Sequence, residues 1–280
     1  MFEVLQYEFM QNALIAGLLA AVACGVVGTY VVTKRVVFIS GGIAHTSFGG
    51  IGLGYLAGIN PVLGAMIFAV ASALGIGVIT QKTKLSEDAT IGILWAMGMA
   101  LGTIFIGLAP GYAPDLFGYL FGSILTVRFT DIILMIILDA VIVVAVLALY
   151  KELLAISFDE EFSTIVGIPV KVLHLLLLCL IALTIVVLIR VVGIILVIAL
   201  LTIPATLARQ FTYDLKKMMA LAVLFGVVFT YIGLWLSYVL NVASGATIIL
   251  LSGTVLFAYL GISRLRARKR STAHAENHTA

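Results

Sequence analysis

Residues 170–209 read VKVLHLLLLCLIALTIVVLIRVVGIILVIALLTIPATLAR, an apolar stretch interrupted mainly by Arg190 and Gly193. As a single helix this stretch would be about 60 Å long, at about 1.5 Å per residue. The hydrocarbon core of a bilayer is only about 30 Å thick. Because basic residues lie at both ends of the stretch, we expect two membrane crossings joined by a tight turn on the outer side.

The rest of the chain is similarly apolar. Of its 280 residues, 63% are hydrophobic and only 10% are charged, and the mean hydropathy is +1.25. Soluble domains carry roughly 25% charged residues, and a soluble core of this size could not bury so much apolar surface. The apolar runs are long and continuous, unlike the alternating segments of about 10 residues in membrane β-barrels. The composition therefore predicts an all-α integral membrane protein.

We predict eight or nine membrane spans, the number depending on residues 170–210. A span needs about 20 apolar residues, and the nine candidates lie at about residues 12–33, 37–58, 61–80, 89–109, 130–150, 170–189, 192–210, 217–240 and 244–262. Residues 115–127 are apolar but too few to span, so we expect a re-entrant or interfacial helix there. The spans form one transmembrane domain, residues 1–262, followed by a basic tail, residues 263–280, that we expect to be disordered.

Basic residues mark every second connection between the predicted spans. They lie at residues 34–35, 82–84, 151, 209–217 and 264–270. Basic connections are retained in the cytoplasm, so we expect the N-terminus outside and the C-terminus inside a bacterial cell membrane. The sequence has no G-x-x-x-x-G-K-[ST] motif, so ATP hydrolysis would require a separate subunit.

The second predicted span carries the most unusual sequence, SGGIAHTSFGG at residues 40–50. Its histidine, His45, lies about 10 Å inside the span, where a polar side chain is costly without partners. Imidazole is a good ligand for zinc, but a histidine that only packs between helices is equally compatible with the pattern. The span also holds glycines at helical spacing, which favour close helix packing: Gly41, Gly49, Gly50, Gly54 and Gly58.

Asp139 is an ionisable residue in the middle of the fifth predicted span. If that helix runs inward, Asp139 lies within about 6 Å of the depth of His45. A carboxyl group at this depth is neutral, paired or facing water. We favour a structural or neutral role, with a place in the ion path as the alternative.

Residues 151–169 form an amphipathic connection that contains the acidic run Asp159, Glu160 and Glu161, followed by Gly167. By itself this pattern is typical of a solvated loop.

Several segments together resemble the permeases of metal-ion ABC importers, the zinc and manganese uptake group. The matching segments are ISGGIAH at 39–45, SEDATIG at 86–92, DLFGYLFGSIL at 115–125, FDEE at 158–161, GIP at 167–169, RVVG at 190–193 and LTIPA at 201–205. The resemblance extends from about residue 10 to residue 260. It implies a homodimer, two cytosolic ABC ATPase subunits and an extracytoplasmic metal-binding protein, with no permanently bound cofactor.

The resemblance also assigns roles to residues. It identifies Phe158, Asp159, Glu160, Glu161 and Gly167 as part of a cytoplasmic coupling helix that docks on the ATPase. Many members of the family carry an aspartate four residues before the histidine, where this chain has Gly41. A carboxylate near His45 would then come from elsewhere, and Asp139 is the candidate within this chain.

The substrate that we expect is a divalent metal ion, with zinc first and manganese or iron as alternatives. A histidine without its neighbouring aspartate disfavours manganese, which prefers oxygen ligands. A permease for siderophores or cobalamin is the nearest alternative. A secondary carrier is a more distant one, because such carriers usually show internal repeats. An intramembrane metalloenzyme would require a larger cluster of ligands with a general base.

Overall fold

The computed structural model describes residues 6–110, 122 and 124–279. In these ranges the chain is helical, and no strand is present. The elements are α1 (Glu8–Thr33), α2 (Val37–Ala57), α3 (Pro61–Lys82), α4 (Glu87–Leu108), the 3-10 turn η2 (Ile124–Thr126), α6 (Phe129–Ala148), α7 (Tyr150–Phe158), α8 (Glu160–Ile165), α9 (Val170–Val192), α10 (Ile194–Arg209), α11 (Leu215–Leu240) and α12 (Ser244–Thr279).

Local sequence explains where several helices begin. Before α3, the side chain of Asn60 accepts a hydrogen bond from the Val62 N–H at 2.9 Å. Before α4, Ser86 accepts from the Ala89 N–H at 3.2 Å. Asp214 does the same for α11 by accepting from the N–H groups of residues 216 and 217. These side chains satisfy main-chain donors that have no partner within the helix.

Seven helices in the described ranges are long and apolar enough to cross a membrane: α1, α3, α4, α6, α9, α11 and α12. Helices also occupy the other two predicted spans, but α10 has only 16 residues and α2 is rich in glycine, serine and threonine. The all-helical membrane class is therefore confirmed, whereas the exact number of crossings is not. The re-entrant helix predicted at 115–127 falls mostly outside the described residues.

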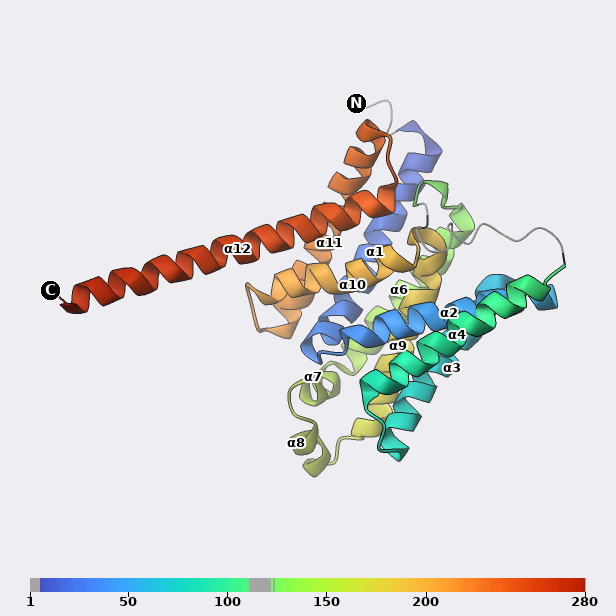
Figure 1. Cartoon of the computed structure of the whole chain (residues 1–280), viewed down its shortest axis with the longest axis horizontal. Helices are drawn as coiled ribbons and strands as arrows, with labels where there is room; N and C mark the ends of the chain where they lie inside the picture. The colour runs from blue at the N-terminus through green and yellow to red at the C-terminus, as the bar shows by residue number, and fades with distance from the viewer. Residues whose placement is uncertain (1–5, 111–121, 123, 280) are drawn as a thin grey trace.

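The long apolar stretch is two helices, α9 and α10, that meet at Gly193. This residue has φ +81° and ψ 160°, a conformation that glycine adopts without the penalty that a Cβ would bring. The two helices run in different directions from this joint (Figure 1). The main chain of Gly122 lies against Val192 and Gly193, so that a Cβ on Gly122 would overlap with their backbone.

Helices α1 and α9 hold the bundle together. Helix α1 packs against α6, α10 and α11, while α2 packs against α3 and α4. Helix α9 contacts members of both groups, chiefly α3, α2 and α6. The core is accordingly richest in residues of α1 and α9, such as the fully buried Tyr30 and Ile181.

Helix α12 continues without a break past residue 262 to Thr279 and projects from the bundle (Figure 1). The segment that we expected to be a disordered tail is thus helical up to Thr279 in the structure. Its alanine, leucine, arginine and lysine residues are good helix formers, which is consistent with an extension of α12. The division of the chain into a domain and a tail at residue 262 stays a prediction.

Candidate functional site

His45 lies on α2 and is stacked on Trp95 of α4. The ring centroids are 4.3 Å apart and the planes are within 5° of parallel. Phe38, which also lies on α2, has its ring centroid 5.9 Å from that of Trp95, with the two planes tilted by 46°. Nδ1 of His45 is buried and has no hydrogen-bond partner among the residues that the structure describes. A buried imidazole nitrogen without a partner is unfavourable, so this atom is available to a ligand.

Gly41 lies one helical turn before His45, and its missing side chain leaves room beside the imidazole. A Cβ built on Gly41 would lie 3.8 Å from Cζ3 of Trp95 and 4.0 Å from Cδ1 of Ile198. These neighbours are apolar, and Gly41 itself supplies no side-chain ligand beside His45. Across the described ranges, no group of three or more His, Cys, Asp and Glu residues is arranged to hold a metal ion. The described part of one copy of the chain therefore supplies an incomplete set of ligands at His45.

The glycines of α2 bring its backbone against α3 and α4. A Cβ on Gly50 would overlap with the main chain of Gly64, and a Cβ on Gly49 would lie 2.8 Å from the ring of Phe68. Gly54 is similarly close to Pro61. Gly58 has a different place: it is the C-cap of α2 at φ 66°, and a Cβ there would meet nothing within 4 Å. Its contribution is conformational, because the left-handed region favours glycine.

Asp139 and His45 lie on helices α6 and α2, which do not pack substantially against each other. It lies on α6, is 7% exposed, and its Oδ2 has no hydrogen-bond partner among the described residues. Helix α6 packs on α1 and α9, whereas α2 packs mainly on α3, α4, α9 and α10. This packing does not support Asp139 as the carboxylate ligand beside His45 within one chain. Its place in the ion path stays a prediction.

Residues 150–168 form two short helices at one end of the bundle. Asp159 ends α7 and caps α8, its side chain accepting from the Phe162 N–H at 2.9 Å. The loop after α8 is closed by Gly167 at φ +89° and by a bond from the Ile168 N–H to the Ser163 carbonyl at 2.9 Å. These contacts give the acidic run a defined helical structure instead of a loose loop.

The same segment exposes several large apolar side chains. Phe158 is 63% exposed, Phe162 61% and Ile165 83%. We call these three residues the α8 patch. Most residues of α7 that face the bundle, such as Leu153 and Ile156, are in contrast fully buried. Clustered exposed aromatic and aliphatic side chains are typical of a protein–protein contact.

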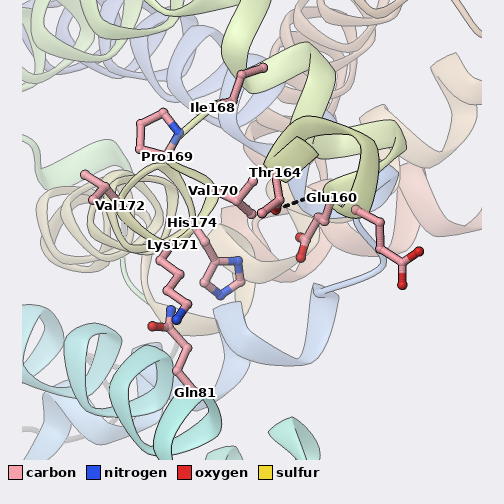
Figure 2. Close-up of a pocket in the computed structure, with 10 residues that line it drawn as sticks. Gln81, Glu160, Thr164, Ile168, Pro169, Val170, Lys171, Val172 and His174 are labelled. Carbon is pink, nitrogen blue, oxygen red and sulfur yellow. Dashed lines mark hydrogen bonds between the residues drawn. The ribbon is translucent and has the colours of Figure 1, made fainter. Parts of the chain in front are cut away.

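A cavity of about 600 Å³ lies beside α8, between it, the start of α9 and the end of α3. Figure 2 shows Glu160, Lys171 and His174 around it, with Gln81 entering from α3. Glu160 also forms an ion pair, with its Oε1 2.6 Å from Nζ of Lys34. Sequence reasoning treated Lys34 only as a marker of orientation, because nothing local links it to a residue 126 positions away.

Trp95 was also missed by the sequence reasoning. The available signal was that it is one of only two tryptophans in the chain and lies in a predicted span. Its partner on α2 becomes visible only once α2 and α4 are packed together.

Comparisons with known proteins match nearly the whole length of the chain. Residues 6–262 match the family model described as the ABC 3 transport family. An uncharacterized membrane protein of Synechocystis sp. is 48% identical over 264 residues, 94% of each chain. The manganese transport system membrane protein MntC of Listeria monocytogenes is 40% identical over 253 residues, 90% of each chain. A solved structure, PsaBC from Streptococcus pneumoniae in complex with Fab, is 33% identical with a TM-score of 0.82, covering 92% of this chain and 93% of that one.

Proposed function

This chain belongs to the ABC 3 transport family, and on that premise we propose that it is the membrane-spanning permease subunit of an ATP-driven importer for a divalent transition-metal ion. The observation that carries the proposal is the match to a manganese transport membrane protein, 40% identical over 90% of both chains. The sequence has no nucleotide-binding motif, in keeping with a non-catalytic subunit of the bacterial plasma membrane whose ATPase is a separate protein.

The α8 patch is the surface that we assign to the ATPase subunit. Phe162 and Ile165 project from α8, a short helix whose capping aspartate and following glycine fix its shape, and Phe158 projects from the end of α7. Such a small, defined and apolar protrusion suits insertion into a groove of a soluble partner. We assign this end of the bundle to the cytoplasm, with the N-terminus outside and the C-terminus inside, because four of the five predicted basic connections adjoin α7 or α8 or lie near them.

We infer that the active permease is a homodimer that receives its ion from an extracytoplasmic binding protein. The incomplete ligand set at His45 supports this inference, because two copies of the chain together would supply two imidazoles to a shared path. Weak coordination suits a conduit, since a permeating ion must leave as readily as it enters. Transport would proceed by alternating access, driven by ATP binding and hydrolysis in the partner subunit.

Zinc is the ion that we propose first. The side of His45 next to Gly41 faces Trp95 and Ile198, and an imidazole in such surroundings suits zinc better than manganese, which prefers carboxylate and water oxygens. Manganese is the second candidate, because the relative named above is a manganese transport protein.

Two measurements test the proposal. The first is co-purification of an ATPase subunit with the tagged chain from its native membrane. The second is cellular metal content, measured by mass spectrometry in metal-depleted medium with and without this chain. We expect a selective loss of zinc that the intact chain restores. A loss of manganese or iron would keep the permease and replace the ion, whereas no loss of any metal together with no ATPase would contradict the proposal.

A further inference from the structure

Lys34 lies where α1 ends, yet its side chain reaches the α7–α8 segment. Nζ of Lys34 is 2.6 Å from Oε1 of Glu160 and donates a second hydrogen bond to the Ile156 carbonyl at 3.3 Å. The lysine side chain is only 6% exposed, whereas that of Glu160 is 52% exposed. A lysine withdrawn from water to this degree depends on its partners, because an unpaired buried ammonium group is costly.

Helix α8 has few other attachments to the bundle. It packs mainly on α7 and α9, the helices next to it in the chain. On the α9 side the cavity separates part of α8 from Lys171 and His174 (Figure 2). Among the ion pairs and side-chain hydrogen bonds found in the described ranges, the bond between Lys34 and Glu160 is the one that joins α8 to a helix far away in sequence. Within these ranges the pair is therefore a direct polar link between α8 and the end of α1.

The turn between α1 and α2, to which Lys34 belongs, is short and hydrogen-bonded. Lys34 is the C-cap of α1, and Arg35 follows in the left-handed conformation at φ 61°. The Arg35 N–H donates to the Val32 carbonyl at 3.3 Å and the Val36 N–H to the Val31 carbonyl at 3.0 Å. This pair of bonds is the Schellman arrangement, which leaves the chain little freedom between helices. Helix α2 begins at residue 37, and His45 lies about two turns further along it.

We propose that Lys34 is a positioning residue that couples α8 to the turn between α1 and α2, and thereby to the helix that carries His45. The inference rests on the proposed function, because it needs an ATPase that moves α8. The Lys34 ammonium group binds α8 through the carboxylate of Glu160 and α7 through the main-chain carbonyl of Ile156. Both helices therefore move with the end of α1. The α8 patch then binds the ATPase, whereas the Lys34–Glu160 pair passes the movement inward.

The experiment uses the complete transporter, with its ATPase and binding protein, reconstituted into liposomes. ATP hydrolysis and uptake of zinc or manganese, supplied in turn, are measured in the same preparation. The central variant is Glu160→Gln, and its matched control is Glu152→Gln. Glu152 is a carboxylate in the first turn of α7 and forms no ion pair within the described part of the chain.

We expect Glu160→Gln to lower the number of ions transported per ATP by about tenfold, the usual effect on an equilibrium of losing one hydrogen bond to a charged group. Glu152→Gln should change this ratio less than about twofold, and both variants should retain the ATPase on purification. Lys34→Met should match Glu160→Gln, and the double variant should be no worse than either single one, because the pair acts as a unit. Lys34→Arg should retain most of the wild-type number of ions transported per ATP, since arginine keeps the positive charge and the hydrogen-bond donors.

Equal effects of Glu160→Gln and Glu152→Gln would overturn the inference, as would losses that multiply in the double variant. A parallel fall of uptake and hydrolysis caused by a lost ATPase would also overturn it, since Glu160 would then serve docking alone. If the unaltered chain itself retains no ATPase, the proposed function fails and the inference falls with it, which is a distinguishable result.

Discussion

Replacement of Gly50 by alanine tests how closely α2 and α3 approach each other. In the structure, a Cβ on Gly50 would overlap with the main-chain carbonyl of Gly64. A backbone carbonyl cannot move aside by changing a rotamer, so the two helices would have to separate. Overpacking of this kind costs about 1–3 kcal/mol, while the better helix propensity of alanine returns about 1 kcal/mol. We therefore expect the free energy of unfolding to fall by up to about 2 kcal/mol.

The assay is thermal unfolding of the purified chain in detergent, in which about 2 kcal/mol corresponds to a fall in Tm of roughly 4–8 °C. The matched control is Gly253→Ala in α12, where a Cβ would meet nothing within 4 Å. Only the propensity term acts there, so the control should keep or slightly raise the Tm. If Gly50→Ala raised the Tm as much as Gly253→Ala, the direct backbone contact between α2 and α3 would be refuted.

Three further predictions concern transport, the aromatic stack and ATPase docking. His45→Ala should reduce metal uptake while leaving assembly with the ATPase intact, and unchanged uptake would remove His45 from the mechanism. In a Trp235→Phe background Trp95 is the sole tryptophan, since the chain has two; zinc should then change its fluorescence through the imidazole stacked on it, and His45→Ala should abolish the response. Phe162→Ser should lower the amount of co-purified ATPase by about fivefold or more, whereas Val172→Ser, which alters a similarly exposed apolar residue (64% against 61%), should not; equal losses would exclude the α8 patch as the docking site.

Much of the helical architecture follows from sequence because a bilayer imposes simple rules of length and polarity. Helices occur at all nine predicted spans, and the break at Gly193 lies inside the apolar stretch that, as one helix, would be about twice the membrane thickness. The number of crossings could not be derived in the same way. The short α10 and the glycine-rich α2 owe their positions to neighbouring helices, and hydropathy does not report that packing.

The candidate site was predictable in its parts but not in its arrangement. His45 and the acidic run at residues 159–161 stand out by type and position. Their partners, Trp95 and Lys34, belong to other helices, and a single sequence carries no local signal for contacts between distant segments. Asp139 shows the converse: its calculated depth matched that of His45, yet α6 packs on a different side of the bundle from α3 and α4, the main neighbours of α2.

The enclosure of α2 also has a consequence for biogenesis. Its glycines, serines and threonines suit contact with other helices, but they make it a poor segment to partition into lipid alone. Its main neighbours, α3 and α4, are synthesised immediately after it. Helix α2 is therefore expected to leave the translocon together with α3 and α4, and a released chain truncated after residue 57 should leave this helix accessible to water and proteases, whereas a chain that extends through α4 should protect it.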